Sequence, residues 1–120
     1  MKIINLTLHA VTVIPETGAP VAFESSGVMA RVQEISQALP DLGTQSGPVP
    51  LQRVSYAEQI DGLPDPIPGV IYLVSRITAS AAEHRDDLVF PQGELRDDNG
   101  QIIGCRSLGT FSEPNFDDWS

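Results

Sequence analysis

Cysteine, lysine and long apolar runs are all scarce in this chain, and each scarcity excludes a class of protein. Cys105 is the single cysteine, so the chain forms no internal disulfide, as is typical of proteins from a reducing compartment. No apolar run approaches the roughly 18 residues that cross a bilayer, and the first residues lack the apolar core of a signal peptide. We therefore expect a cytoplasmic protein that has no membrane partner.

Basic side chains are also few. The formal net charge is −9, from 16 acidic and 7 basic residues. Nucleic acids need a basic face that replaces their condensed counterions, so this charge argues against DNA as a partner. Lys2 is the only lysine, and the other basic residues are arginines, whose planar forks suit phosphate and carboxylate groups. Pairing of these arginines with the many acids explains the same composition equally well.

Length and turn content predict a small single domain. A chain of 120 residues fits one core, and 10 glycines and 10 prolines favour short elements joined by turns. We predict an α+β fold, a mostly antiparallel β-sheet with one short helix, in which residues 1–111 form a ligand-binding domain and residues 112–120 an acidic tail. The expected elements are strands over 2–8, 11–14, 21–24, 28–33, 51–57, 70–74, 94–98 and 101–108, a helix over 76–84, and a surface loop over 41–50.

Two segments carry the strongest local signals. Residues 70–74 are uninterruptedly apolar, which is typical of the most buried strand of a sheet. Asn99 and Gly100 tolerate the positive φ angles of a type I′ turn and lie between alternating segments, which predicts a hairpin with Arg96 opposite Ile103. Arg106 then falls on the other face, so one pocket in one chain cannot easily use both arginines, whereas an oligomer could.

The residues that catalysis needs are thinly supplied. His9 and His84 are the only histidines, and the chain has no nucleophile elbow, no glycine-rich phosphate loop and no zinc-ligand spacing. We therefore expect no catalytic residue, no metal site and no cofactor. The alternative is a small nucleotide-processing enzyme, for instance a phosphodiesterase that uses His9 or His84.

A binding site is better supported. Ser75 can cap a helix that begins at the end of the buried strand, where backbone N–H groups attract anions, with help from Arg76 or Arg85. An ordinary helix cap accounts for Ser75 as well. Arg31 alternates away from the apolar residues of its strand, which directs it into a pocket or into water.

Several stretches in the same order, covering nearly the whole chain, match one family pattern. They are residues 4–9, 26–32, 62–66, 69–75, 85–89 and 95–105, of which Tyr-x-Val-Ser at 72–75 and Arg-Asp-x-x-Gly at 96–100 are the most specific. In these stretches the chain resembles the small phage-encoded Thoeris anti-defence proteins of the first type, which act as sponges for nucleotide immune signals. It departs from them at Leu8, where relatives have proline, in the long loop over 41–50, and beyond Phe111.

The resemblance implies binding, without cleavage, of a cyclic ADP-ribose variant made by TIR-domain immune enzymes, so that host anti-phage defence in the host cytoplasm is inhibited. It also implies a homo-oligomer, a dimer or a hexamer, and some relatives that hold cyclic di- or trinucleotides. It assigns phosphate contacts to Arg31 and Arg96, and Asp86 suits ribose hydroxyls. The predicted ligand-binding residues are Asn5, Thr7, His9, Arg31, Ser75, Arg85, Asp86 and Arg96. A further alternative is an inhibitor that docks on another protein through its acidic surface.

Overall fold

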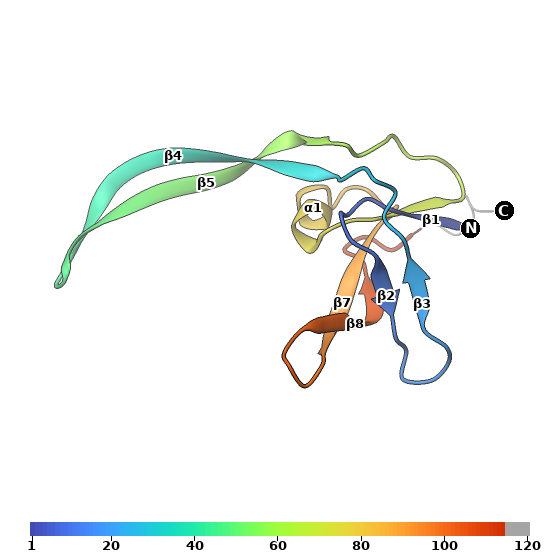
Figure 1. The fold of residues 1–120 in the computed structure, drawn as a ribbon. Coiled ribbons are helices and arrows are strands. Elements are labelled where there is room, and N and C mark those ends of the chain that lie inside the picture. Colours follow the sequence, from blue (N-terminus) through green and yellow to red (C-terminus); the bar gives the residue numbers. More distant parts are fainter. Residues whose placement is uncertain (115–120) are drawn as a thin grey trace.

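Strands dominate residues 1–114, the part of the chain that the computed structural model describes. They are β1 (Lys2–Asn5), β2 (Val11–Val13), β3 (Val21–Phe23), β4 (Arg31–Thr44), β5 (Gly47–Asp61), β6 (Val70–Leu73), β7 (Leu88–Arg96) and β8 (Ile102–Gly109), with the helix α1 (Arg76–Ala81) between β6 and β7 (Figure 1). Strands make up 54% of the structure and helix 5%. The predicted α+β class is therefore wrong, and the protein is mostly β, because the alanine-rich segment after Ser75 forms fewer than two helical turns.

Six strands form a sheet that nearly closes into a barrel. Their order is β1-β6-β7-β8-β2-β3. The predicted antiparallel sheet is in fact mixed, because β1 with β6, β6 with β7 and β8 with β2 pair in parallel. The two edges meet at a bridge between Asn5 and Ser25, where the amide of Ser26 donates to the carbonyl of Asn5 at 2.9 Å.

β6 is buried on both faces, as its apolar run predicts. Tyr72 and the following Val74 pack into a cluster that lies under α1, with Ala79 and Phe90 among its members. Ile71 and Leu73 face the other way, into a second cluster formed with β1, β2, β3, β7 and β8. A strand that is buried on both faces has apolar residues at every position, and not at every second one. This explains the uninterrupted apolar run of β6.

α1 covers one face of the sheet. It buries Thr78 and Ala79, while Ile77 on its outer side is 59% exposed. The helix ends at Ala81 and not at His84, because the backbone of the buried C-cap residue Ala82 leaves the helical region, with φ −120° and ψ 42°. Within residues 1–114 no helix is long and apolar enough to cross a membrane.

β4 and β5 form a separate two-stranded antiparallel sheet that projects far from the six-stranded body (Figure 1). We call this hairpin, residues 31–61, the arm. The radius of gyration is 17.9 Å, against about 14 Å for a compact domain of this length. The predicted surface loop over 41–50 is wrong, since the turn is confined to the residues between Thr44 and Gly47 and the flanking residues pair as strands.

The predicted hairpin at Asn99 and Gly100 is confirmed. β7 and β8 pair antiparallel, and the amide of Gly100 donates to the carbonyl of Asp97 at 3.0 Å. Gly100 has a φ of 81° but no residue other than glycine has a positive φ in the described chain, so the turn is not of type I′. A register shift places Arg96 opposite Ile102, one residue away from the predicted partner.

The segment that follows β8 packs against the body. The rings of Phe111 and Phe90 lie 4.7 Å apart between centroids, and the hydroxyl of Thr110 donates to the carbonyl of Leu88 at 3.0 Å. Most of the predicted acidic tail, residues 115–120, lies outside the described residues.

Gly100→Ala is expected to lower the free energy of unfolding by about 1 to 3 kcal/mol, because an L-residue is strained at a positive φ. No atom lies within 4 Å of a Cβ added at Gly100 or at Gly43. Of these two glycines, Gly100 has a positive φ and Gly43 does not. Gly43→Ala is therefore the matched control and should be neutral or slightly stabilising. Thermal unfolding of both variants measures the difference, and equal melting temperatures would contradict the assigned turn.

Candidate functional site

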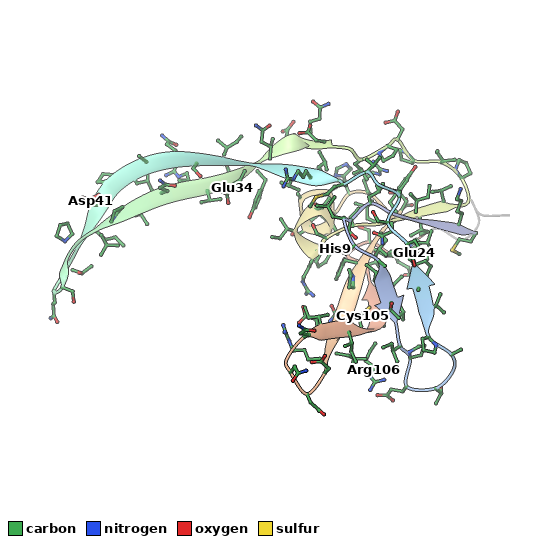
Figure 2. The ribbon with its side chains drawn as sticks, in the orientation of Figure 1. His9, Glu24, Glu34, Asp41, Cys105 and Arg106 are labelled. Carbon is green, nitrogen blue, oxygen red and sulfur yellow. The ribbon has the colours of Figure 1, made fainter. Side chains whose placement is uncertain are left out.

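A hollow of about 560 Å³ opens on the body beside the start of α1, and we call it the α1 hollow. It brings together three of the predicted site residues, Thr7, His9 and Ser75, and His9 lies on the body close to α1 (Figure 2). Ligand sites usually occupy about 300 to 1,000 Å³, so the hollow has the size of a small-molecule site. Its lining is Thr7, His9, Val11, Val74, Ser75, Arg76, Pro91, Gln92, Gly93 and Glu94.

The side chain of Asn5 shapes the loop that delivers Thr7 and His9. Asn5 is 2% exposed. Its Nδ2 donates to the carbonyl oxygens of His9 at 2.9 Å and Phe23 at 2.8 Å, and its Oδ1 accepts from the amide of Thr7 at 2.9 Å. The strand predicted over 2–8 therefore stops at Asn5. Asn5 faces the protein interior, while Thr7 and His9 reach the hollow.

Ser75 is the N-cap of α1. Its Oγ accepts from the amide of Thr78 at 3.2 Å and lies 2.9 Å from the Thr78 hydroxyl. The hydroxyl is thus engaged within the protein, and α1 has only six residues. The geometry therefore supports the interpretation of Ser75 as an ordinary helix cap over its interpretation as an anion-binding residue.

Arg76, the first residue of α1, supplies the positive charge of the hollow. Its Nη1 donates to Oε1 of Gln92 at 2.8 Å. Its guanidinium carbon lies 5.1 Å from the ring centroid of Phe90 and 5.8 Å from that of Phe111, within the range of cation–π attraction. The guanidinium is held in place from two directions, and Gln92 takes only one of its five N–H donors.

Glu94 lines the hollow on the β7 side, and Arg96 is its neighbour. Nη2 of Arg96 lies 3.0 Å from Oε2 of Glu94, and Nη1 donates to the carbonyl of Gly100 at 2.7 Å. Both side chains of the pair are more than half exposed. Arg96 therefore lies at the hairpin turn and outside the α1 hollow, and its predicted phosphate contact stays a prediction.

Arg85 and Asp86 lie beyond the C-terminal end of α1, in the loop before β7. Arg85 pairs with the buried Asp87 through two hydrogen bonds, Nε to Oδ1 at 2.8 Å and Nη2 to Oδ2 at 2.7 Å, and also donates to the carbonyl of Pro64 at 2.9 Å. The hydrogen bonds that the Arg85 guanidinium donates to Asp87 raise its pKa, and burial together with the Asp87 charge raises the pKa of the Tyr72 phenol. This cluster fastens the loop before β7 to the turn before β6, and Asp86 is exposed.

Arg31 begins β4 at the root of the arm, where it lies opposite Asp61. The side chain is exposed, and Arg31 lines none of the hollows described in this single chain. Its role as a phosphate contact stays a prediction. The structure thus groups Thr7, His9 and Ser75 at one place and disperses the three predicted arginines to the arm root, the Asp87 pair and the hairpin turn.

Sequence reasoning missed Gln92 and Glu94 and considered Arg76 only as an alternative to Arg85. The available signal was alternation in β7, which sets Gln92 and Glu94 on one face of that strand. Among residues 1–114 no three His, Cys, Asp or Glu side chains gather closely enough to hold a metal ion.

Arg85→Ala is expected to lower the free energy of unfolding by about 3 kcal/mol, because it leaves the Asp87 carboxylate buried without its partner. The estimate is at the lower end of such costs since the Arg85 side chain keeps 15% exposure. Asp86→Ala, one residue along and exposed, is the matched control and should change stability by less than about 0.5 kcal/mol. Urea unfolding measures both, and a similar small loss for the two variants would refute the structural role of the pair.

Comparison of the chain with protein-family models, with curated proteins and with solved structures finds no significant match in any of the three. The resemblance to the Thoeris anti-defence proteins therefore rests on the sequence stretches alone and stays an expectation.

Proposed function

We propose that the chain binds and sequesters, without cleaving it, a cyclic nucleotide of the cyclic ADP-ribose class, and that the α1 hollow is the binding site. One observation carries the proposal. The guanidinium of Arg76 is held at the wall of a hollow of about 560 Å³ that also offers carboxylate and apolar surfaces.

The lining groups match the parts of such a ligand. Arg76 suits a pyrophosphate, because a guanidinium presents donors in a planar fork. The carboxylate of Glu94 can accept hydrogen bonds from ribose hydroxyls. Val11, Val74 and Pro91 form an apolar wall on which a base can lie. One cation and one anion in the same hollow favour a ligand that carries both phosphates and hydroxyl groups over a simple anion.

Sequestration makes a quantitative demand on affinity. A protein that removes a signal by holding it must bind well below the concentration at which the signal acts, and a dissociation constant of 1 μM corresponds to about −8.2 kcal/mol. Each bound molecule is then withheld from the immune effector, which the resemblance to the Thoeris anti-defence proteins implies as the biological outcome. Cyclic di- and trinucleotides are the second ligand class to test.

Cyclic ADP-ribose itself is the first probe. Isothermal titration calorimetry measures whether it binds, and heating the complex then unfolds the protein and releases whatever was bound. We expect the intact cyclic nucleotide to return to solution. Recovery of a linear or hydrolysed product would replace the proposal with the nucleotide-processing enzyme, and the absence of binding by every cyclic nucleotide tested would favour a protein-docking inhibitor.

Arg76→Ala is expected to weaken binding by about 1.5 to 3 kcal/mol, because the phosphate loses a charge-assisted hydrogen bond from an exposed arginine. Arg76→Lys should restore part of the affinity, since an ammonium supplies charge without the two-point grip. Arg106→Ala is the matched control, because this exposed arginine is not among the residues that line the α1 hollow and it donates to the carbonyl of Ile14 at 3.2 Å. Calorimetry on the folded variants measures all three.

Arg31→Ala tests the separate assignment that the resemblance makes. A loss comparable to that of Arg76→Ala would mean that the ligand contacts the root of an arm. Equal affinity for Arg31→Ala and the wild type, with both folded, would remove Arg31 from the site. Equal affinity for Arg76→Ala and the wild type would refute the α1 hollow as the binding site.

A further inference from the structure

The arm presents an apolar stripe on one of its two faces. Residues directly opposite each other across an antiparallel pair share a face, and so do residues two apart along a strand. Leu39 lies opposite Leu51, and Leu42 lies opposite Val49. Ile35, four residues before Leu39 on β4, adds to the same face, although the Gln37–Arg53 pair lies between it and the leucines.

The stripe is uncovered in the single chain. Ile35 is 51% exposed, Leu42 49%, Val49 44% and Leu51 37%. A two-stranded hairpin standing alone in water is marginally stable at best, and it needs an opposing layer on its apolar face. Large exposed apolar surface of this kind marks an interaction site.

Charge selects the kind of partner. The whole chain carries a formal net charge of −9. The charged residues within 35–57 are Asp41 and Arg53 alone, and their charges cancel. Asp41 lies toward the far end of the arm (Figure 2). A second copy of this acidic chain meets electrostatic repulsion at most surfaces, and the part of the arm over residues 35–57 is where it can approach with least repulsion. We propose that the apolar stripe of the arm is the homo-oligomer interface and that it packs on the arm of a second copy.

The packing is face to face and not edge to edge. A strand edge can recruit another strand through its unpaired N–H and C=O groups, and proline on an edge blocks such pairing. Pro40 lies in β4, and Pro48 and Pro50 lie in β5. The outer half of both edges therefore lacks the continuous row of donors that strand addition requires.

A two-fold axis at the Leu39–Leu51 pair lets each copy offer the same surface to the other and keeps the two Arg53 side chains apart. The 14 residues of β4 span about 46 Å, and two strands about 10 Å, so one arm face covers roughly 460 Å². A stable interface needs about 800 Å² from each partner. One arm face thus supplies about half of that area, so the remaining half has to come from the surfaces beside the arm roots that the antiparallel overlap brings together.

Sedimentation velocity at micromolar protein concentration tests this interface without any ligand, so its result is independent of the proposed nucleotide binding. The wild type is expected to sediment as a dimer or larger assembly of the 12.9 kDa chain. The double variant Leu39→Asn and Leu51→Asn is expected to weaken self-association at least 100-fold and to sediment as a monomer. Leu42→Asn with Val49→Asn, at the tip, should act in the same direction.

Val54→Asn is the matched control. Val54 is 49% exposed and lies three residues from Leu51 on β5, hence on the opposite face of the arm. It should leave the assembly intact, and the melting temperature of the body should be retained in every variant that remains folded. A monomeric wild type, an assembly that survives both double variants, or a loss equal to theirs in Val54→Asn would each overturn the proposal.

Discussion

The buried amide of Asn5 is the point on which the arrangement of the body depends. Both hydrogen atoms of its Nδ2 and the lone pairs of its Oδ1 have partners in the chain. These bonds tie the end of β1 to β3 across the gap in the barrel and at the same time fold the loop that carries Thr7 and His9. The same side chain therefore closes the barrel and positions one wall of the α1 hollow. An amide left without hydrogen-bond partners in this buried place would carry a desolvation cost.

The parts of the fold that were predictable from the sequence are those with local causes. The uninterrupted apolar run of β6 and the Asn99-Gly100 turn depend on burial and backbone preference, which short segments encode. The arm was not predictable in this way. Its outer residues are rich in glycine, proline and serine, a composition typical of a surface loop, and the pairing of Leu42 with Val49 becomes evident only once the register is known.

The candidate site was predictable in part for a similar reason. Capping chemistry indicated Ser75, and the run of polar residues near the N-terminus indicated Thr7 and His9. Each of these signals is contained within a few neighbouring residues. The approach of Gln92 and Glu94 to Arg76 depends on how β7 packs beside α1, a contact between segments distant in sequence. The three predicted arginines are separated for the same reason, since pairing with Asp87 and Glu94 and the path of β4 decide where each one lies.

The arm begins and ends at the same place, because Arg31 lies opposite Asp61. β1 and β6 pair in parallel although they are far apart in the sequence. This hairpin reduces the effective length of the chain between them. Once β4 and β5 have paired, residues 31–61 no longer count toward the length of the loop that must close before β1 can meet β6. The entropic cost of closing that loop falls accordingly. Hairpins form within microseconds, so the arm lowers the kinetic barrier of a topology whose contacts are otherwise distant.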